Sequence, residues 1–256
     1  MEKKRLVYNI LAPVIGCLVF IAVWFVVAAA IGKSIILPSP WETLVGFFRL
    51  LGEASFYSAI GKTLARTLLG FVIAFALACV FAFLSTWSEF FKKAFAPITV
   101  IMRVLPTISV ILLVLIWVKS ATAPYVITFL VIFPMLYTSV KDAAENVDPA
   151  LLEMCDAFRL TPVKKLVYLY IPEMTPAVLT GISITLSFSV KLTVAAEVLA
   201  STQGSLGRNM AQASAYIDTP MLLAWTLAAI LLGFLLEGLV LLVKYLLTRR
   251  YHGTKN

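Results

Sequence analysis

Six long runs of apolar residues constrain this chain more than any other feature of its sequence. Each run is long enough to cross the roughly 30 Å hydrocarbon layer of a membrane as a helix. The runs cover approximately residues 6–31, 62–86, 94–118, 121–140, 176–200 and 221–247. With 61% hydrophobic residues, the chain is too apolar for a soluble domain. We therefore expect an all-α integral membrane protein with six transmembrane helices, forming one domain over residues 1–256.

Prolines interrupt the third and fourth of these runs. Pro97 and Pro106 lie in the third run and Pro134 in the fourth. A proline in a spanning helix kinks it and leaves a backbone group that neighbouring helices must satisfy. The helices should therefore pack together as a bundle.

The distribution of basic residues predicts how the chain is oriented. With the N-terminus in the cytoplasm, the inner side holds Lys3, Lys4, Arg5, Lys92, Lys93, Lys141, Arg159, Lys164, Lys165, Lys244, Arg249, Arg250 and Lys255. The outer side then holds only Lys33, Arg49, Lys62, Lys119 and Arg208. Because cytoplasmic loops carry the excess of Lys and Arg, both termini are expected in the cytoplasm. The protein as a whole is expected to contact membrane lipid. The sequence contains no basic helix of the kind that binds nucleic acid, so no nucleic-acid partner is expected.

The longest polar interruption, residues 148–176, is cytoplasmic in this orientation. It contains three Asp-Pro or Thr-Pro pairs, at Asp148, Thr161 and Thr175, each typical of a helix N-cap followed by proline at the first helical position. We therefore expect two short helices in residues 148–175 and then entry into a long helix. A further outer stretch, residues 41–51, is predicted to lie along the interface, with Trp41, Phe47 and Phe48 as anchors.

The first short helix has an amphipathic pattern. Leu151, Met154, Cys155 and Phe158 recur at helical spacing and are expected on one face. One interpretation is a solvated connector that covers the underside of the bundle. The other is a rigid knob that docks into the groove of a partner. Three defined helix starts favour the knob, because a flexible linker needs none.

Charged residues inside or near the apolar runs allow two interpretations. We expect that none of Arg66, Arg103, Lys191 and Glu197 faces lipid, since a central charge costs roughly 2.5–3.5 kcal/mol on insertion scales. They either line a cationic path for an anionic solute or play a structural part. In the structural interpretation, Arg66 and Lys191 pair with Glu197 or cap carbonyl groups.

Nothing in the sequence indicates catalysis by this chain. The fragments Gly32-Lys33-Ser34 and Gly61-Lys62-Thr63 lack the glycine that opens a nucleotide-binding P-loop. No pairing of carboxylates, no Ser-His-Asp arrangement and no Cys/His spacing of a metal site is present. We therefore predict a protein that is not an enzyme and holds no metal or cofactor.

Several motifs, in order along nearly the whole chain, resemble those of the permease subunits of type I ABC importers. They occupy Leu37–Pro40, Thr63–Arg66 with Gly70-Phe71, Arg103–Pro106, Glu153–Arg159 with Leu169–Pro172, and Ala195–Glu197 with Gly204 and Gly207. The similarity is greatest to the sulfonate, taurine, nitrate and thiamine-precursor branch. Arg159 stands where the family has a glycine, which normally permits a tight turn between two short helices.

The resemblance implies a type I importer permease fold in the bacterial cytoplasmic membrane. It implies a homodimer of this chain, two cytosolic ATPase subunits that bind ATP and Mg, and an extracytoplasmic solute-binding protein. The solute would be a small anionic or polar organic compound. The residues expected to couple to the ATPase are Leu151, Glu153, Met154, Cys155, Ala157, Phe158, Arg159, Thr161 and Pro172. Those expected along the translocation path are Arg103, Lys191 and Glu197.

Two other functions are compatible with a polytopic membrane protein. A secondary transporter would use Lys191 and Glu197 as a proton relay and would work without an ATPase. A membrane assembly factor would carry no solute at all.

Overall fold

The computed structural model describes the backbone of residues 2–252 and the side chains of residues 11–246. The side chains of Lys3, Lys4, Arg5, Arg249 and Arg250, and all of Lys255, lie outside the described residues, so their predicted cytoplasmic placement stays a prediction.

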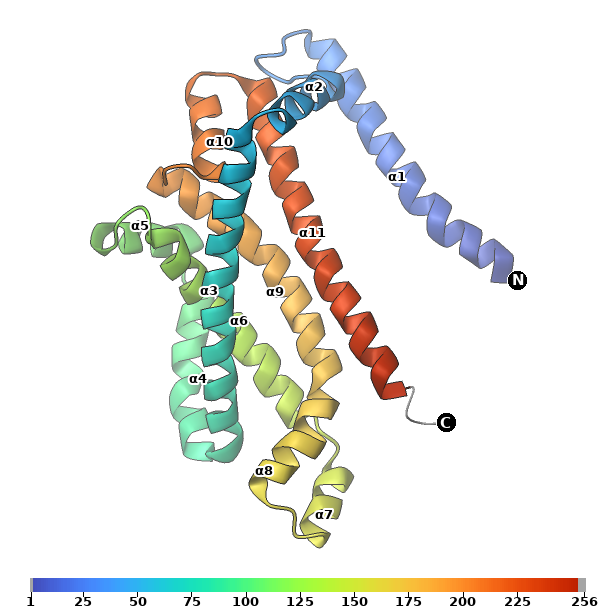
Figure 1. The fold of residues 1–256 in the computed structure, drawn as a ribbon, viewed down its shortest axis with the longest axis vertical. Coiled ribbons are helices and arrows are strands. Elements are labelled where there is room, and N and C mark those ends of the chain that lie inside the picture. Colours follow the sequence, from blue (N-terminus) through green and yellow to red (C-terminus); the bar gives the residue numbers. More distant parts are fainter. Residues whose placement is uncertain (1, 253–256) are drawn as a thin grey trace.

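The described residues form helices joined by short turns, with no strand among them (Figure 1). In chain order the elements are α1 Glu2–Ile31, α2 Pro40–Leu51, α3 Ala54–Trp87, α4 Glu89–Val104, α5 Thr107–Trp117, α6 Ala123–Glu145, α7 Pro149–Ala157, α8 Pro162–Lys165, the π-helical segment η1 Leu166–Tyr170, α9 Ile171–Ala200, α10 Leu206–Ala215 and α11 Thr219–His252. The short helices α7 and α8 lie at one end of the molecule, and α2 and α10 at the opposite end.

Five stretches are long and apolar enough to cross a membrane: Leu11–Ile31, Ala54–Trp87, Ala123–Glu145, Pro162–Ala200 and Thr219–Leu246. The third predicted run, residues 94–118, differs from a single kinked helix, because α4 and α5 meet at 97°. Leu105 takes an extended ψ of 128° directly before Pro106, as steric pressure from a following proline requires. Pro97 and Pro134, in contrast, lie inside α4 and α6 without ending them.

The predicted helix start at Thr175-Pro176 is wrong. Residues Pro162–Ala200 form one continuous helical stretch, and Pro176 lies inside α9. The π-helical segment η1 precedes α9, and the N–H of Ile171 donates to the carbonyl of Leu166, five residues back. This wider turn leads directly into Pro172 at the start of α9 without ending the helix.

The bundle is centred on α6, which packs between α3 and α9. Small residues permit these close contacts: a Cβ on Gly70 of α3 would lie 2.9 Å from the Cβ of Thr128 on α6. Hydroxyl groups bridge the same helices, as in the 2.9 Å hydrogen bond between Thr128 and Thr193 of α9. Such packing is typical of membrane helices, which gain little from burying apolar surface against each other.

At the end opposite α7, α2 forms a helix over the stretch that was predicted to lie along the interface, and its interfacial placement stays a prediction. Ser39 and Glu42 make a reciprocal capping box at its start. Trp41 and Phe48 are exposed, which fits interfacial anchors. Phe47 is not such an anchor, because its ring packs inward, 6.1 Å from the ring of Phe56 on α3.

Candidate coupling surface and polar sites in the membrane

Two short helices and a tight turn build the polar segment between α6 and α9. Asp148 caps α7 as predicted, since its carboxylate accepts a 2.9 Å hydrogen bond from the N–H of Ala150. Thr161 takes the extended N-cap conformation before Pro162, although its side chain makes no capping hydrogen bond. An ion pair between Asp156 of α7 and Lys165 of α8 links the two helices.

The turn between α7 and α8 is closed by Arg159, whose φ is +51°. The N–H of Leu160 donates to the carbonyl of Cys155 at 3.0 Å, and the N–H of Arg159 to that of Asp156 at 2.9 Å. These two bonds form a Schellman motif, which needs a left-handed residue at the position that Arg159 occupies. This geometry explains why the family has a glycine at this position, because glycine adopts the left-handed conformation without steric cost.

One side of α7 packs against the bundle. Cys155, Val147 and Leu169 form a small buried cluster, with Leu151 and Leu152 packed against it. The predicted apolar face is therefore wrong in part: Cys155 and Leu151 turn inward, whereas Met154 and Phe158 are exposed. At 100° per residue the centre of the buried face falls between Leu151 and Leu152, so Met154 lies outside it.

The other side of this segment presents apolar side chains outward. The exposed fractions are 49% for Met154, 73% for Phe158, 69% for Val163 and 73% for Tyr168. We call these four residues the coupling surface. The predicted coupling residues Glu153, Ala157, Arg159 and Thr161 are also exposed, and Pro172 is half-buried at the start of α9.

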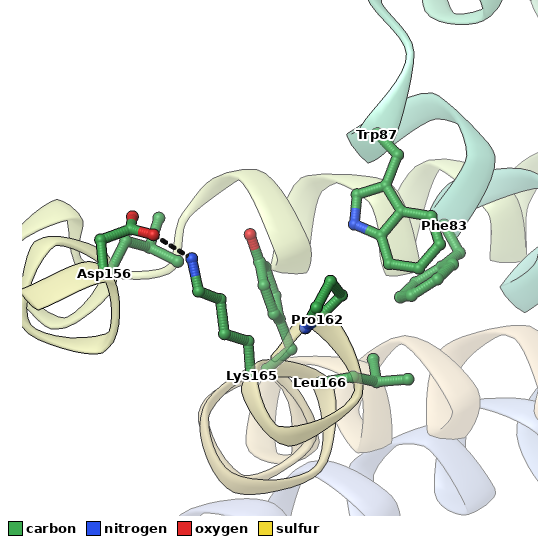
Figure 2. Close-up of a pocket in the computed structure, with 8 residues that line it drawn as sticks. Phe83, Trp87, Asp156, Pro162, Lys165 and Leu166 are labelled. Atoms are coloured by element: carbon green, nitrogen blue, oxygen red, sulfur yellow. Dashed lines mark hydrogen bonds and ion pairs between the residues drawn. The ribbon is translucent and has the colours of Figure 1, made fainter. Parts of the chain in front are cut away.

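A cleft separates this segment from the C-terminal end of α3 (Figure 2). Its volume is ≈ 330 Å³. Its lining residues are Phe83, Trp87, Leu152, Asp156, Pro162, Lys165, Leu166 and Tyr170. The rings of Phe83 and Trp87 form one wall, and the Asp156–Lys165 pair lies at the opposite side. The segment is thus attached to the bundle through α6 and α9, with open space toward α3.

A buried polar network lies near the other end of α9. The carboxylate of Glu197, which is 0% exposed, accepts a 2.9 Å hydrogen bond from Arg66 of α3. It also accepts from the hydroxyl of Thr63 at 2.8 Å and from the N–H of Gly207 at 3.2 Å. The Thr63 hydroxyl in turn accepts from the N–H of Leu206. We call this network the outer knot, because it ties α3, α9 and α10 together.

Gly207 is required for the outer knot. A Cβ there would lie 2.6 Å from the Cβ of Glu197 and 2.6 Å from the carbonyl oxygen of Val194. Two motifs that are far apart in the sequence, one at Thr63 and the other at Glu197 and Gly207, therefore meet at one point. The structural interpretation of Arg66 and Glu197, an ion pair, is what the structure shows.

The remaining predicted path residues lie apart from this network. Arg103, near the end of α4, and Lys191, on α9, are both exposed, whereas Glu197 is fully buried. Their assignment to a solute path stays a prediction. Among the described residues, no group of three or more His, Cys, Asp or Glu side chains has the geometry to hold a metal ion.

A family model described as "Binding-protein-dependent transport system inner membrane component" matches residues 75–252, which is more than half of the chain. The chain belongs to this family. It is a permease subunit of an ABC importer, and this membership decides against the secondary transporter and the assembly factor. The permease is 24% identical to the formylaminopyrimidine transport permease protein ThiX of Halalkalibacterium halodurans, over 89% of this chain and 91% of the relative. It is 26% identical to the taurine transport system permease protein TauC of Escherichia coli, over 86% and 82%.

A solved structure shares the fold of the permease. A chain of a bacterial alginate ABC transporter, in complex with an alginate pentasaccharide-bound periplasmic protein, matches with a TM-score of 0.60 over 93% of each chain. The sequences are 13% identical, so this likeness shows the fold alone. The fold is that of type I importer permeases, as the motifs predicted.

Sequence reasoning overlooked one charged residue of the permease. Glu237 is the sole acidic residue in the run 221–247, and a count of every charge in the run would have found it. It lies half-buried in α11, where its carboxylate accepts a 3.2 Å hydrogen bond from the hydroxyl of Ser187 on α9. Leu152 was also overlooked as part of the buried face of α7.

Proposed function

We propose that two copies of this permease form the path of an ATP-driven importer, and that a cytosolic ATPase subunit grips the coupling surface of each copy. An extracytoplasmic binding protein delivers the solute to the opposite end. In this arrangement α7, α8 and both termini face the cytoplasm, as the excess of basic residues on that side favours. ATP and Mg belong to the ATPase subunits, and the permease itself makes or breaks no bond.

The observation that carries the proposal is the coupling surface. Met154, Phe158, Val163 and Tyr168 expose apolar side chains at an end of the molecule that carries Lys164 and Glu153 and therefore faces water. An exposed apolar patch on such a surface is typical of a protein–protein interface. Burying one Phe or Met side chain contributes roughly 1.5–3 kcal/mol, so these side chains suffice as anchors for a partner.

The helix that follows supplies a mechanical link. Residues Pro162–Ala200 are continuous, and at 1.5 Å per residue their length is ~58 Å. The coupling surface lies at one end, and the outer knot anchors the other end through Glu197. A movement that closure of the ATPase dimer imposes on α7 and α8 would therefore tilt α9 about the outer knot. ATP binding would thus shift the population from a state in which the path is open to the inner side to one in which it is open to the outer side.

The relatives favour a small anionic or polar organic solute. One is named for formylaminopyrimidine transport and another for taurine transport. Arg103 and Lys191 are exposed cations on or next to spanning helices, where facing lipid is costly. Both fit a path for a solute that carries negative charge.

The proposal is tested by replacing Phe158 with Asp in the full transporter, reconstituted with its ATPase and binding protein. The variant should insert normally but lose solute-stimulated ATP hydrolysis and retain less ATPase during purification. The matched control is Phe90→Asp on α4, because Phe90 is 84% exposed but lies outside the coupling surface. Equal stimulation of the Phe158 variant and the wild type would contradict the proposal.

A further inference from the structure

The carboxylate of Glu237 lies far from either end of its span. In Thr219–Leu246, about 18 residues or ~27 Å of helix precede it. A carboxylate at this depth is costly in contact with lipid, and such residues mark solute or ion pathways by default. Its one hydrogen bond among the described residues comes from the hydroxyl of Ser187. One carboxylate accepts up to about four hydrogen bonds, so Glu237 retains capacity for a ligand.

Lys191 lies one helical turn from Ser187, on the same side of α9. This face of α9 is exposed and includes Ile184, Phe188 and Lys191. Within the described residues, no ion pair joins Lys191 or Glu237 to an opposite charge. Two opposite charges therefore flank Ser187 without neutralising each other.

The register between α9 and α11 shows what lies beside Lys191. Ser187 of α9 donates a hydrogen bond to Glu237 of α11. Seven residues earlier in α9, the hydroxyl of Thr180 accepts a 2.9 Å hydrogen bond from Lys244, which lies seven residues later in α11. The two helices are thus antiparallel neighbours over two turns. One turn from Ser187 toward Lys191 corresponds to one turn from Glu237 toward Gly233. A Cβ built on Gly233 meets no atom within 4 Å, so the space over Gly233, at the level of Lys191 in this register, is open.

We propose that Lys191, Ser187 and Glu237 bind a small dipolar solute over Gly233, a compound with a sulfonate or carboxylate at one end and an ammonium group at the other. The ammonium of Lys191 donates to the anionic end, and the carboxylate of Glu237 accepts from the cationic end. This inference rests on the proposed function, since the site is of use only along a solute path. It narrows the proposed solute class from anionic or polar organic compounds to zwitterionic ones.

The test uses the full transporter in nanodiscs and two radiolabelled probes of similar size. Taurine carries a sulfonate and an ammonium group, and isethionate carries a hydroxyl group in place of the ammonium. The wild type should bind taurine about tenfold more tightly, the effect of one charged hydrogen bond. Glu237→Gln should weaken taurine binding to the level of isethionate. Lys191→Met should weaken the binding of both probes about tenfold.

Two glycine variants check the location and separate it from misfolding. Gly233→Leu should fill the space and abolish binding of both probes. Gly238→Leu is its matched control, because a Cβ there also meets no atom within 4 Å but lies beyond Glu237 on the exposed face. An unchanged preference for taurine in Glu237→Gln would overturn the inference, as would the absence of taurine binding to the wild type.

Retention of the ATPase is measured on the same samples. If the ATPase fails to co-purify with the wild type, the proposed function itself fails. If it co-purifies and the probe preferences do not change as described, only this inference fails.

Discussion

The strained turn at Arg159 allows a sharp test of how the coupling surface is held. An L-residue in the left-handed region costs roughly 1–2 kcal/mol, and glycine avoids this cost. Glycine also loses more backbone entropy on folding, by roughly 0.5–1 kcal/mol. Arg159 has φ +51° and is exposed, so both effects apply to it. From their difference, Arg159→Gly should stabilise the turn by about 1 kcal/mol.

Hydrogen–deuterium exchange measures this local stability directly. The amide of Leu160, which donates to the carbonyl of Cys155 at 3.0 Å, opens when the turn opens. A gain of about 1 kcal/mol corresponds to roughly fivefold slower exchange of this amide. Amides of α6 and α11 should not change, because the substitution acts only on the turn.

Arg159→Ala is the matched control, because it removes the guanidinium but keeps a Cβ at the same positive φ. Its Leu160 amide should exchange at about the wild-type rate. The reasoning is refuted if the Gly variant exchanges no more slowly than the wild type. It is also refuted if the Ala variant gains as much protection, since the effect would then come from the charge.

The remaining predictions concern the two ends of the molecule. Gly207→Ala forces a Cβ to within 2.6 Å of Glu197 and should lower stability by about 1–3 kcal/mol, measured as a fall in the thermal midpoint in detergent; an unchanged midpoint would count against the outer knot. Glu197→Gln removes the partner of the buried Arg66 and should cost about 3–5 kcal/mol, whereas the double variant Glu197→Gln/Arg66→Met should recover part of this loss in the same assay. The hydrogen bond from the Ser34 hydroxyl is the main cause that lowers the pKa of Glu42 from 4.5, and the bonds from Ser39 are the next. The stability that the Glu42 carboxylate adds by capping α2 is therefore full above pH 4.5 and is lost as the pH falls through the lowered pKa. The fluorescence of Trp41 should report this acid transition in the wild type and not in Glu42→Gln.

Much of the fold follows from the sequence because a membrane leaves few choices. The apolar runs locate the spans, since a segment without water must satisfy its backbone as a helix. The helix starts at Asp148 and Thr161 are local features that the sequence shows directly, although only Asp148 makes a side-chain capping bond. Local rules fail where several prolines compete. The chain bends by 97° at Pro106, whereas helix α9 continues through Pro176, and the local sequence does not distinguish the two prolines.

The candidate sites were less predictable, because they depend on contacts between distant residues. Arg66 and Glu197 are 131 residues apart in the sequence, and no periodicity indicates that they meet. The inward face of α7 was partly mispredicted, since spacing alone does not fix where a short helix meets the bundle. The position of Glu237 was visible as an isolated charge, but its partner Ser187 emerges only from the antiparallel register of α9 and α11.

The central claim is that the coupling surface is where the ATPase attaches. A photo-reactive phenylalanine analogue placed at position 158 of the full transporter tests this contact most directly. Ultraviolet irradiation should give an adduct of the permease with the ATPase subunit, while the same analogue at position 90, which is even more exposed, should give none. The account is contradicted if position 158 yields no adduct, or if positions 158 and 90 yield the same amount.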